Sequence, residues 1–184
     1  MQPDTELGNI LLERARQAIE VELGTRGGAP RDDPALERRG ATFVTLTVKG
    51  ELRGCMGSVR AHRSLREDVA ANAVAAATRD PRFTPVTPDE LKDVRVEVSL
   101  LSEPKFLDFS NEEQLLTQVR PGVDGLMLFA GCRSATFLPQ VWEKLPDPAL
   151  FLAGLKQKAG LSPDRPAENL MAATYTVQKW EESR

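Results

Sequence analysis

The chain has 184 residues, with 24 Lys and Arg against 27 Asp and Glu and a net charge of −3. Its 41% hydrophobic and 28% charged content are typical of a globular protein with one sizeable core or two joined subdomains. The charge argues against a global attraction to nucleic acid, and no apolar run approaches the ~20 residues that span a bilayer.

Two cysteines, Cys55 and Cys132, are too few for a disulfide framework. The N-terminal residues lack the basic, then apolar, then small-residue order of a signal peptide. We therefore expect a cytoplasmic protein with two free thiols and no membrane association.

The N-terminal part of the chain predicts one helix and a connector. Residues 5–23 carry apolar side chains at helical spacing, and Gly24 is the stop signal. Residues 25–40 are rich in Gly, Pro, Arg and Asp, which predicts a connector with one short turn at 35–37.

A hairpin is predicted next. Residues 42–49 alternate apolar and polar side chains, as a half-buried strand does. A turn at 49–51 leads to a return strand that begins at Leu52. We therefore expect Cys55 on, or just past, the second strand.

The second helix is predicted from its capping signal. Ser64 followed by Glu67 three residues later forms a capping box. Pro81 ends the helix, because proline disfavours helical backbone in the residue before it. The predicted inner face is Leu65, Val69, Ala73, Ala76 and Ala77.

The remaining elements alternate without a regular strand-helix-strand order, which favours an α+β fold with a mostly antiparallel sheet flanked by helices. The predicted elements are a strand at 94–100, a helix at 111–119, a turn at 121–125, a hairpin at 126–137, helices at 138–145 and after Asp147, and a final strand at 174–180.

The segment Leu52–Gly57 carries the strongest chemical signal. Cys55 lies between Gly54 and Gly57 and follows Arg53, and a nearby guanidinium favours the thiolate form that attacks carbon or disulfides. A free cysteine is more commonly a small, inert core residue. Both readings stay open from the sequence alone.

Three arginines in loops or at strand edges are candidates for an anion pocket. Arg53, Arg82 and Arg133 would supply forked donors if they converge, and otherwise are three unrelated surface residues. Asp80 beside Arg82 predicts a local ion pair, which is worth only ~0–1 kcal/mol when exposed.

Other chemistry has little support in the sequence. The lone His62 is expected to be a solvated loop residue, and one histidine with two distant cysteines does not make a zinc site. Acidic pairs at 112–113 and 181–182 are expected to be solvated surface. No dinucleotide fingerprint or Walker loop is present, so we expect no metal and no evident cofactor.

Four segments together resemble the AMMECR domain family, whose bacterial and archaeal members are called protein A of the AmmeMemoRadiSam system. The segments are Leu52–Gly57, Asp80–Phe83, Pro121–Gly125 and Gly131–Trp142. The resemblance runs in order from about Thr42 to Gly160, and the family usually has isoleucine where Met56 stands.

This resemblance implies a fold and a setting, whereas the biochemical function of the family is not established. It implies one AMMECR-type domain over residues 1–184, with a larger part that holds both termini and a smaller subdomain packed beside it. It also implies that the Arg-Gly-Cys motif lies near a cleft. Family members are often encoded beside a Memo-like protein and a radical-SAM enzyme, which suggests a shared modification pathway.

Whether the chain is an enzyme stays open, and two hypotheses follow. In the first, Cys55 is a nucleophile or thiol-redox centre in a cleft that binds an anionic ligand. The predicted ligand-binding residues are Arg53, Gly54, Gly57, Asp80, Arg82, Phe83 and Arg133. In the second, the cleft belongs to a non-catalytic adaptor for a partner protein, or to a nucleotide- or nucleic-acid-binding module, of which nucleic acid fits the charge least.

Overall fold

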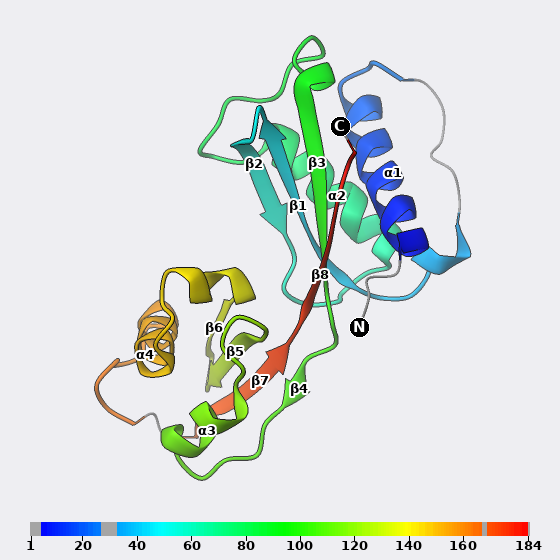
Figure 1. Cartoon of the computed structure of the whole chain (residues 1–184). Coiled ribbons are helices and arrows are strands. Elements are labelled where there is room, and N and C mark those ends of the chain that lie inside the picture. Colours follow the sequence, from blue (N-terminus) through cyan, green and yellow to red (C-terminus); the bar gives the residue numbers. More distant parts are fainter. Residues whose placement is uncertain (1–4, 27–32, 167–168, 184) are drawn as a thin grey trace. The chain divides into compact units, whose positions relative to one another are not determined.

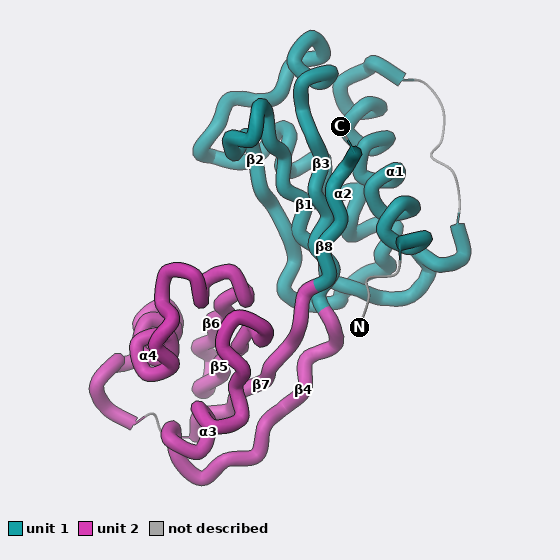
Figure 2. Tube along the Cα trace, in the orientation of Figure 1, with its two compact units in different colours: residues 1–101, 178–184 teal, residues 102–177 magenta. Residues whose placement is uncertain are grey.

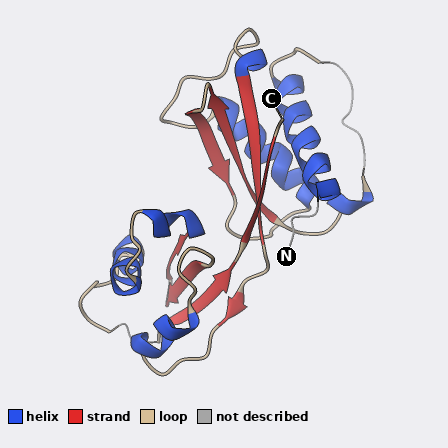
Figure 3. Cartoon of the chain, in the orientation of Figure 1, coloured by secondary structure: helices blue, strands red, loops and turns tan. Residues whose placement is uncertain are grey.

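The computed structural model describes residues 5–26, 33–166 and 169–183. They form an α+β fold whose helices and strands are shown in Figures 1 and 3. The chain divides into two compact units, residues 1–101 with 178–184 and residues 102–177 (Figure 2). The organisation as one domain with two subdomains, and with both termini in the larger, stays a prediction.

The first unit is built on a four-stranded sheet in the order β2-β1-β3-β8. Strand β1 occupies a central position and pairs antiparallel with both β2 and β3. The strands are β1 (Ala41–Val48), β2 (Glu51–Gly57), β3 (Val94–Leu101) and β8 (Val177–Glu181).

The β1–β2 hairpin confirms the predicted turn and adds an irregularity. Lys49 and Gly50 both have positive φ, of 53° and 85°, as a tight two-residue hairpin turn requires. The register then shifts between Leu46, opposite Gly54, and Thr47, opposite Leu52. Arg53 is thus the extra residue of a β-bulge, a feature that re-aims a side chain.

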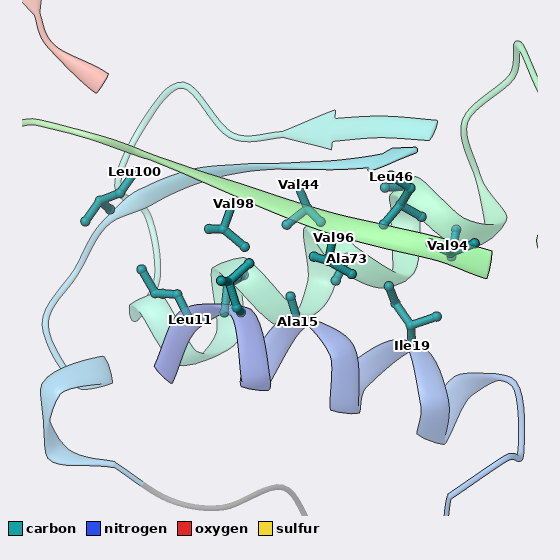
Figure 4. Close-up of a cluster of buried hydrophobic side chains, with 14 of the residues drawn as sticks. Leu11, Ala15, Ile19, Val44, Leu46, Ala73, Val94, Val96, Val98 and Leu100 are labelled. Carbon is teal, nitrogen blue, oxygen red and sulfur yellow. The ribbon is translucent and has the colours of Figure 1, made fainter. Parts of the chain in front are cut away.

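Helices α1 (Thr5–Glu22) and α2 (Leu65–Thr78) cover one face of this sheet (Figure 1). Figure 4 shows Leu11, Ala15 and Ile19 of α1 facing the buried side chains of the strands. The inner face predicted for α2 is buried. The predicted capping box is also confirmed, because Ser64 and Glu67 cap the start of the helix reciprocally. Short 3-10 turns lie at Pro34–Leu36 and Leu91–Asp93.

The second unit has its own antiparallel sheet, in the order β4-β7-β5-β6, and its own core. At its centre the Trp142 ring stacks on Phe151, with centroids 3.7 Å apart. The elements are β4 (Lys105–Phe106), α3 (Glu112–Gln118), β5 (Gly125–Ala130), β6 (Arg133–Phe137), a 3-10 turn at Pro139–Glu143, α4 (Pro148–Lys158) and β7 (Met171–Tyr175).

Two predicted elements differ in the structure. The final strand predicted at 174–180 is wrong, because β7 and β8 are separate strands in different sheets. They are separated at Thr176, whose N–H donates to the Ser102 hydroxyl at 3.0 Å and whose carbonyl accepts from the Ser102 N–H at 2.9 Å. The helix predicted at 138–145 is a shorter 3-10 turn.

Within the ranges that the structure describes, no helix is both long enough and apolar enough to cross a membrane.

Candidate functional site

Cys55 lies on β2, the return strand of the hairpin, as predicted, and its side chain is half-buried. Thr45 is its direct partner on β1, and the Thr45 hydroxyl donates to Sγ at 3.4 Å. Neighbouring Val44 and Leu46 point into the core beneath the helices. Because side chains alternate along a strand, Cys55 and Thr45 lie on the opposite face of the sheet.

The two glycines of the motif permit close packing. A Cβ atom on Gly54 would lie 2.1 Å from the carbonyl oxygen of Ala76, at the end of α2. A Cβ atom on Gly57 would lie 2.3 Å from the Phe43 ring. Glycine is therefore required at both positions by the approach of neighbouring groups. Contact of Gly54 and Gly57 with a ligand stays a prediction.

Arg53 is anchored by Glu90, which sequence reasoning missed. Nε and Nη2 of Arg53 donate to the Glu90 carboxylate at 2.6 and 3.0 Å, and the Arg53 side chain is 15% exposed. The hydrogen bond from Arg53 lowers the pKa of Glu90. Among the described residues, the buried Nη1 atom of Arg53 has no hydrogen-bond acceptor.

Asp80 and Arg82 form the predicted ion pair, but the carboxylate is buried. The Asp80 side chain is 2% exposed, against 54% for Arg82. Asp80 accepts from Nε and Nη2 of Arg82 at 2.9 and 2.6 Å, and from the Cys55 N–H at 2.8 Å. The Arg82 guanidinium, more than the Cys55 N–H, holds the pKa of Asp80 well below its usual range. The predicted local ion pair is therefore present, with a buried carboxylate and an exposed guanidinium.

Phe83 connects the two arginines. Its ring centroid lies 5.9 Å from Cζ of Arg53 and 5.5 Å from Cζ of Arg82, both within cation–π range. Five residues predicted from the sequence are therefore brought together around one edge of the sheet: Arg53, Cys55, Asp80, Arg82 and Phe83.

Arg133 belongs to the second unit, at the start of β6, where its guanidinium donates to the Gly160 carbonyl. Its predicted role beside Cys55 stays a prediction. Cys132 is exposed at the neighbouring hairpin tip, and His62 is exposed in its loop.

Two acidic residues expected to be solvated have specific partners instead. Glu112 accepts from Nζ of Lys156 at 2.8 Å, and that lysine is only 1% exposed. Glu182 pairs with Arg16 and also accepts from the Val96 N–H at 2.9 Å. In the described ranges, no three His, Cys, Asp or Glu side chains are grouped so that they could hold a metal ion.

These features define an α+β protein with two antiparallel sheets and a half-buried cysteine whose backbone contacts Asp80 and Arg82. The AMMECR1 family model matches residues 12–180, and the chain belongs to this family.

Relatives agree with this assignment. A protein of Methanothermobacter thermautotrophicus is 40% identical over 161 residues, which is 85% of this chain and 84% of the relative. A protein of Methanosarcina mazei is 40% identical over 172 residues, or 89% of this chain and 85% of the relative. The crystal structure of the uncharacterized protein PH0010 from Pyrococcus horikoshii is similar, with a TM-score of 0.82 at 35% identity, over 97% of this chain and 92% of that one.

Proposed function

We propose that this chain is a cytoplasmic component of a modification pathway with Memo-like and radical-SAM partners. In this proposal, Cys55 is the centre of a thiol-dependent site for a ligand that carries an anionic group. The partners are proposed from the family setting, whereas the site is proposed from the surroundings of Cys55.

The observation that carries the proposal is an anchored but accessible guanidinium that reaches the backbone of Cys55. Arg82 uses Nε and Nη2 for Asp80, and its side chain is still 54% exposed. A guanidinium has five N–H donors, so Arg82 retains donors for an anionic group. The same residue reaches the Cys55 carbonyl from Nη2 at 3.5 Å.

Arg53 gives further support. Its buried Nη1 has no acceptor among the described residues. A buried donor without an acceptor costs about 1–3 kcal/mol, and such a group in a native structure calls for a reason beyond packing. Three features belong to the consecutive residues 53–55: the bulge at Arg53, the buried Nη1 donor of the same residue, and the thiol of Cys55.

In this site Cys55 acts as the nucleophile or thiol-redox group, and Arg82 holds the anionic part of the ligand. The Phe83 ring lies within cation–π range of both guanidinium groups. Asp80 and Glu90 keep the arginines in place while the ligand binds.

A non-catalytic adaptor is the alternative, and one observation favours it. Two guanidinium groups face two carboxylates, those of Asp80 and Glu90, so the cluster has no excess formal charge. A polar, charge-balanced surface is suited to a partner protein, and it gives less support to nucleotide or nucleic-acid binding. An adaptor would keep its function without the Cys55 thiol.

The two functions are separated by replacing the gene in its native host with Cys55→Ala and, as a matched control, Cys132→Ala. We expect the metabolite profile of Cys55→Ala to match that of a gene deletion at normal protein level, and Cys132→Ala to match the wild type. If Cys55→Ala retains the wild-type profile, the thiol-dependent site is wrong and the adaptor is favoured.

A further inference from the structure

Strand β2 is at the edge of its sheet, and the edge at Cys55 is closed by side chains. Alternate residues of an antiparallel edge strand point their N–H and C=O groups away from the neighbouring strand. At Cys55 the N–H donates to Oδ2 of Asp80 at 2.8 Å, and the carbonyl lies 3.5 Å from Nη2 of Arg82. Asp80 and Arg82 thus occupy the place of a further strand at this one residue.

Asp80 has no acceptor capacity left for a ligand. Its Oδ1 accepts from the N–H and Nε of Arg82 at 3.1 and 2.9 Å. Its Oδ2 accepts from the Cys55 N–H and from Nη2 of Arg82 at 2.8 and 2.6 Å. A carboxylate has about four lone-pair sites, and all four are used in a side chain that is 2% exposed.

Asp80 supplies this restraint beside an irregularity in the strand pairing. Gly54 and Gly57 have no side chains that could hold this segment by hydrogen bonds of their own. The bulge at Arg53 also interrupts the ladder two residues before the thiol. Between Asp80 and Arg82, Pro81 fixes its own φ and limits how far the two side chains can move apart.

We infer that Asp80 is a positioning residue for Cys55, which acts through the Cys55 amide and not by contact with a ligand. This assignment replaces the ligand-binding role predicted for Asp80, and it rests on the proposed function of Cys55. Arg82 both holds Asp80 in place and binds the anionic group of the ligand. It can do both because Asp80 contacts one edge of its guanidinium and the rest is exposed.

The test uses Asp80→Ala and Asp80→Asn in a Cys132→Ser background, so that Cys55 is the only thiol. The matched control is Asp124→Ala, in the second unit. Asp124 is 4% exposed and binds Arg120 in the same way, through Nε and Nη2 at 3.0 and 2.7 Å and the backbone N–H at 2.9 Å.

Two rates are measured on the folded protein: hydrogen exchange of the Cys55 amide, and alkylation of Cys55 by iodoacetamide. We expect Asp80→Ala to raise the exchange rate about tenfold, since a hydrogen bond to a charged group is lost. Alkylation rises as well, because the released strand no longer holds the sulfur against the Thr45 hydroxyl. Asp80→Asn keeps one carbonyl acceptor and gives an intermediate exchange rate.

The inference is overturned if either rate in Asp80→Ala stays at the parent value, or if Asp124→Ala raises both equally. Asp80→Asn decides the matter if Asp80→Ala does not fold. Neither rate depends on what Cys55 does in the cell. Failure of the proposed function is therefore detected separately, by the metabolite profile of the native host that carries Cys55→Ala.

Discussion

Gly54 shows at the scale of one residue how tightly the Cys55 segment is packed. The missing side chain lets β2 approach the end of α2, where a Cβ atom would lie 2.1 Å from a backbone oxygen. A backbone atom cannot rotate out of the way as a flexible side chain can. The identity of this glycine is therefore set by packing beside the thiol.

We expect Gly54→Ala to destabilise the protein by about 1–3 kcal/mol, because the added methyl group forces β2 and α2 apart. The control is Gly154→Ala within α4, where the nearest atom is 3.3 Å away, at the flexible end of Leu145. Alanine favours helix over glycine, so this change is neutral or stabilises by up to about 1 kcal/mol. Urea unfolding measures both, and equal effects would contradict the packing argument.

At the scale of the elements, local sequence signals predicted most of the fold. The β1–β2 hairpin follows from strict alternation and a Lys-Gly turn, and α2 follows from its capping box. These signals are local, since each depends on residues within one or two turns of the chain. Such signals can therefore be recognised without knowledge of the tertiary structure.

The register at Cys55 could not be predicted. Counting back from the turn at Lys49 and Gly50 without a bulge would place Thr45 opposite Gly54. The bulge at Arg53 shifts the register by one residue, so that Thr45 faces Cys55. A bulge depends on how the edge strand meets α2 and the following loop, and the sequence alone does not reveal this.

Long-range partners were missed for a similar reason. Glu112 and Lys156 are 44 residues apart, and Arg16 and Glu182 are 166 apart. An acidic pair in the sequence is typical of solvated surface until its partner is known. The break at Thr176 was missed as well, because apolar side chains continue through it while the chain passes from one sheet to the other.

At the scale of the whole molecule, the anchoring carboxylates make stability depend on pH in a defined direction. Asp80 and Glu90 both have pKa values below their usual range, because each is hydrogen-bonded to an arginine. A lowered folded-state pKa adds stability above the unfolded value, about 4 for these groups, and that stability is lost as the pH falls through the folded value.

We expect the urea midpoint to fall as the pH is lowered from about 5 to 3, because both carboxylates bind protons more readily in the unfolded chain. Asp80→Asn removes one of these groups, so its midpoint falls less over the same range, although it starts lower at pH 7. If the urea midpoints of the variant and the wild type fall in parallel with pH, Asp80 does not contribute to the pH dependence of stability.

Competitive labelling of the native protein by limiting iodoacetate tests whether Cys55 is the working thiol of an anionic-ligand site. Exposure alone favours Cys132, which is exposed, over the half-buried Cys55. We expect Cys55 to be carboxymethylated first, because Arg82 attracts the reagent's carboxylate to it. Labelling of Cys132 first, with Cys55 unreactive until the protein is unfolded, would contradict the claim.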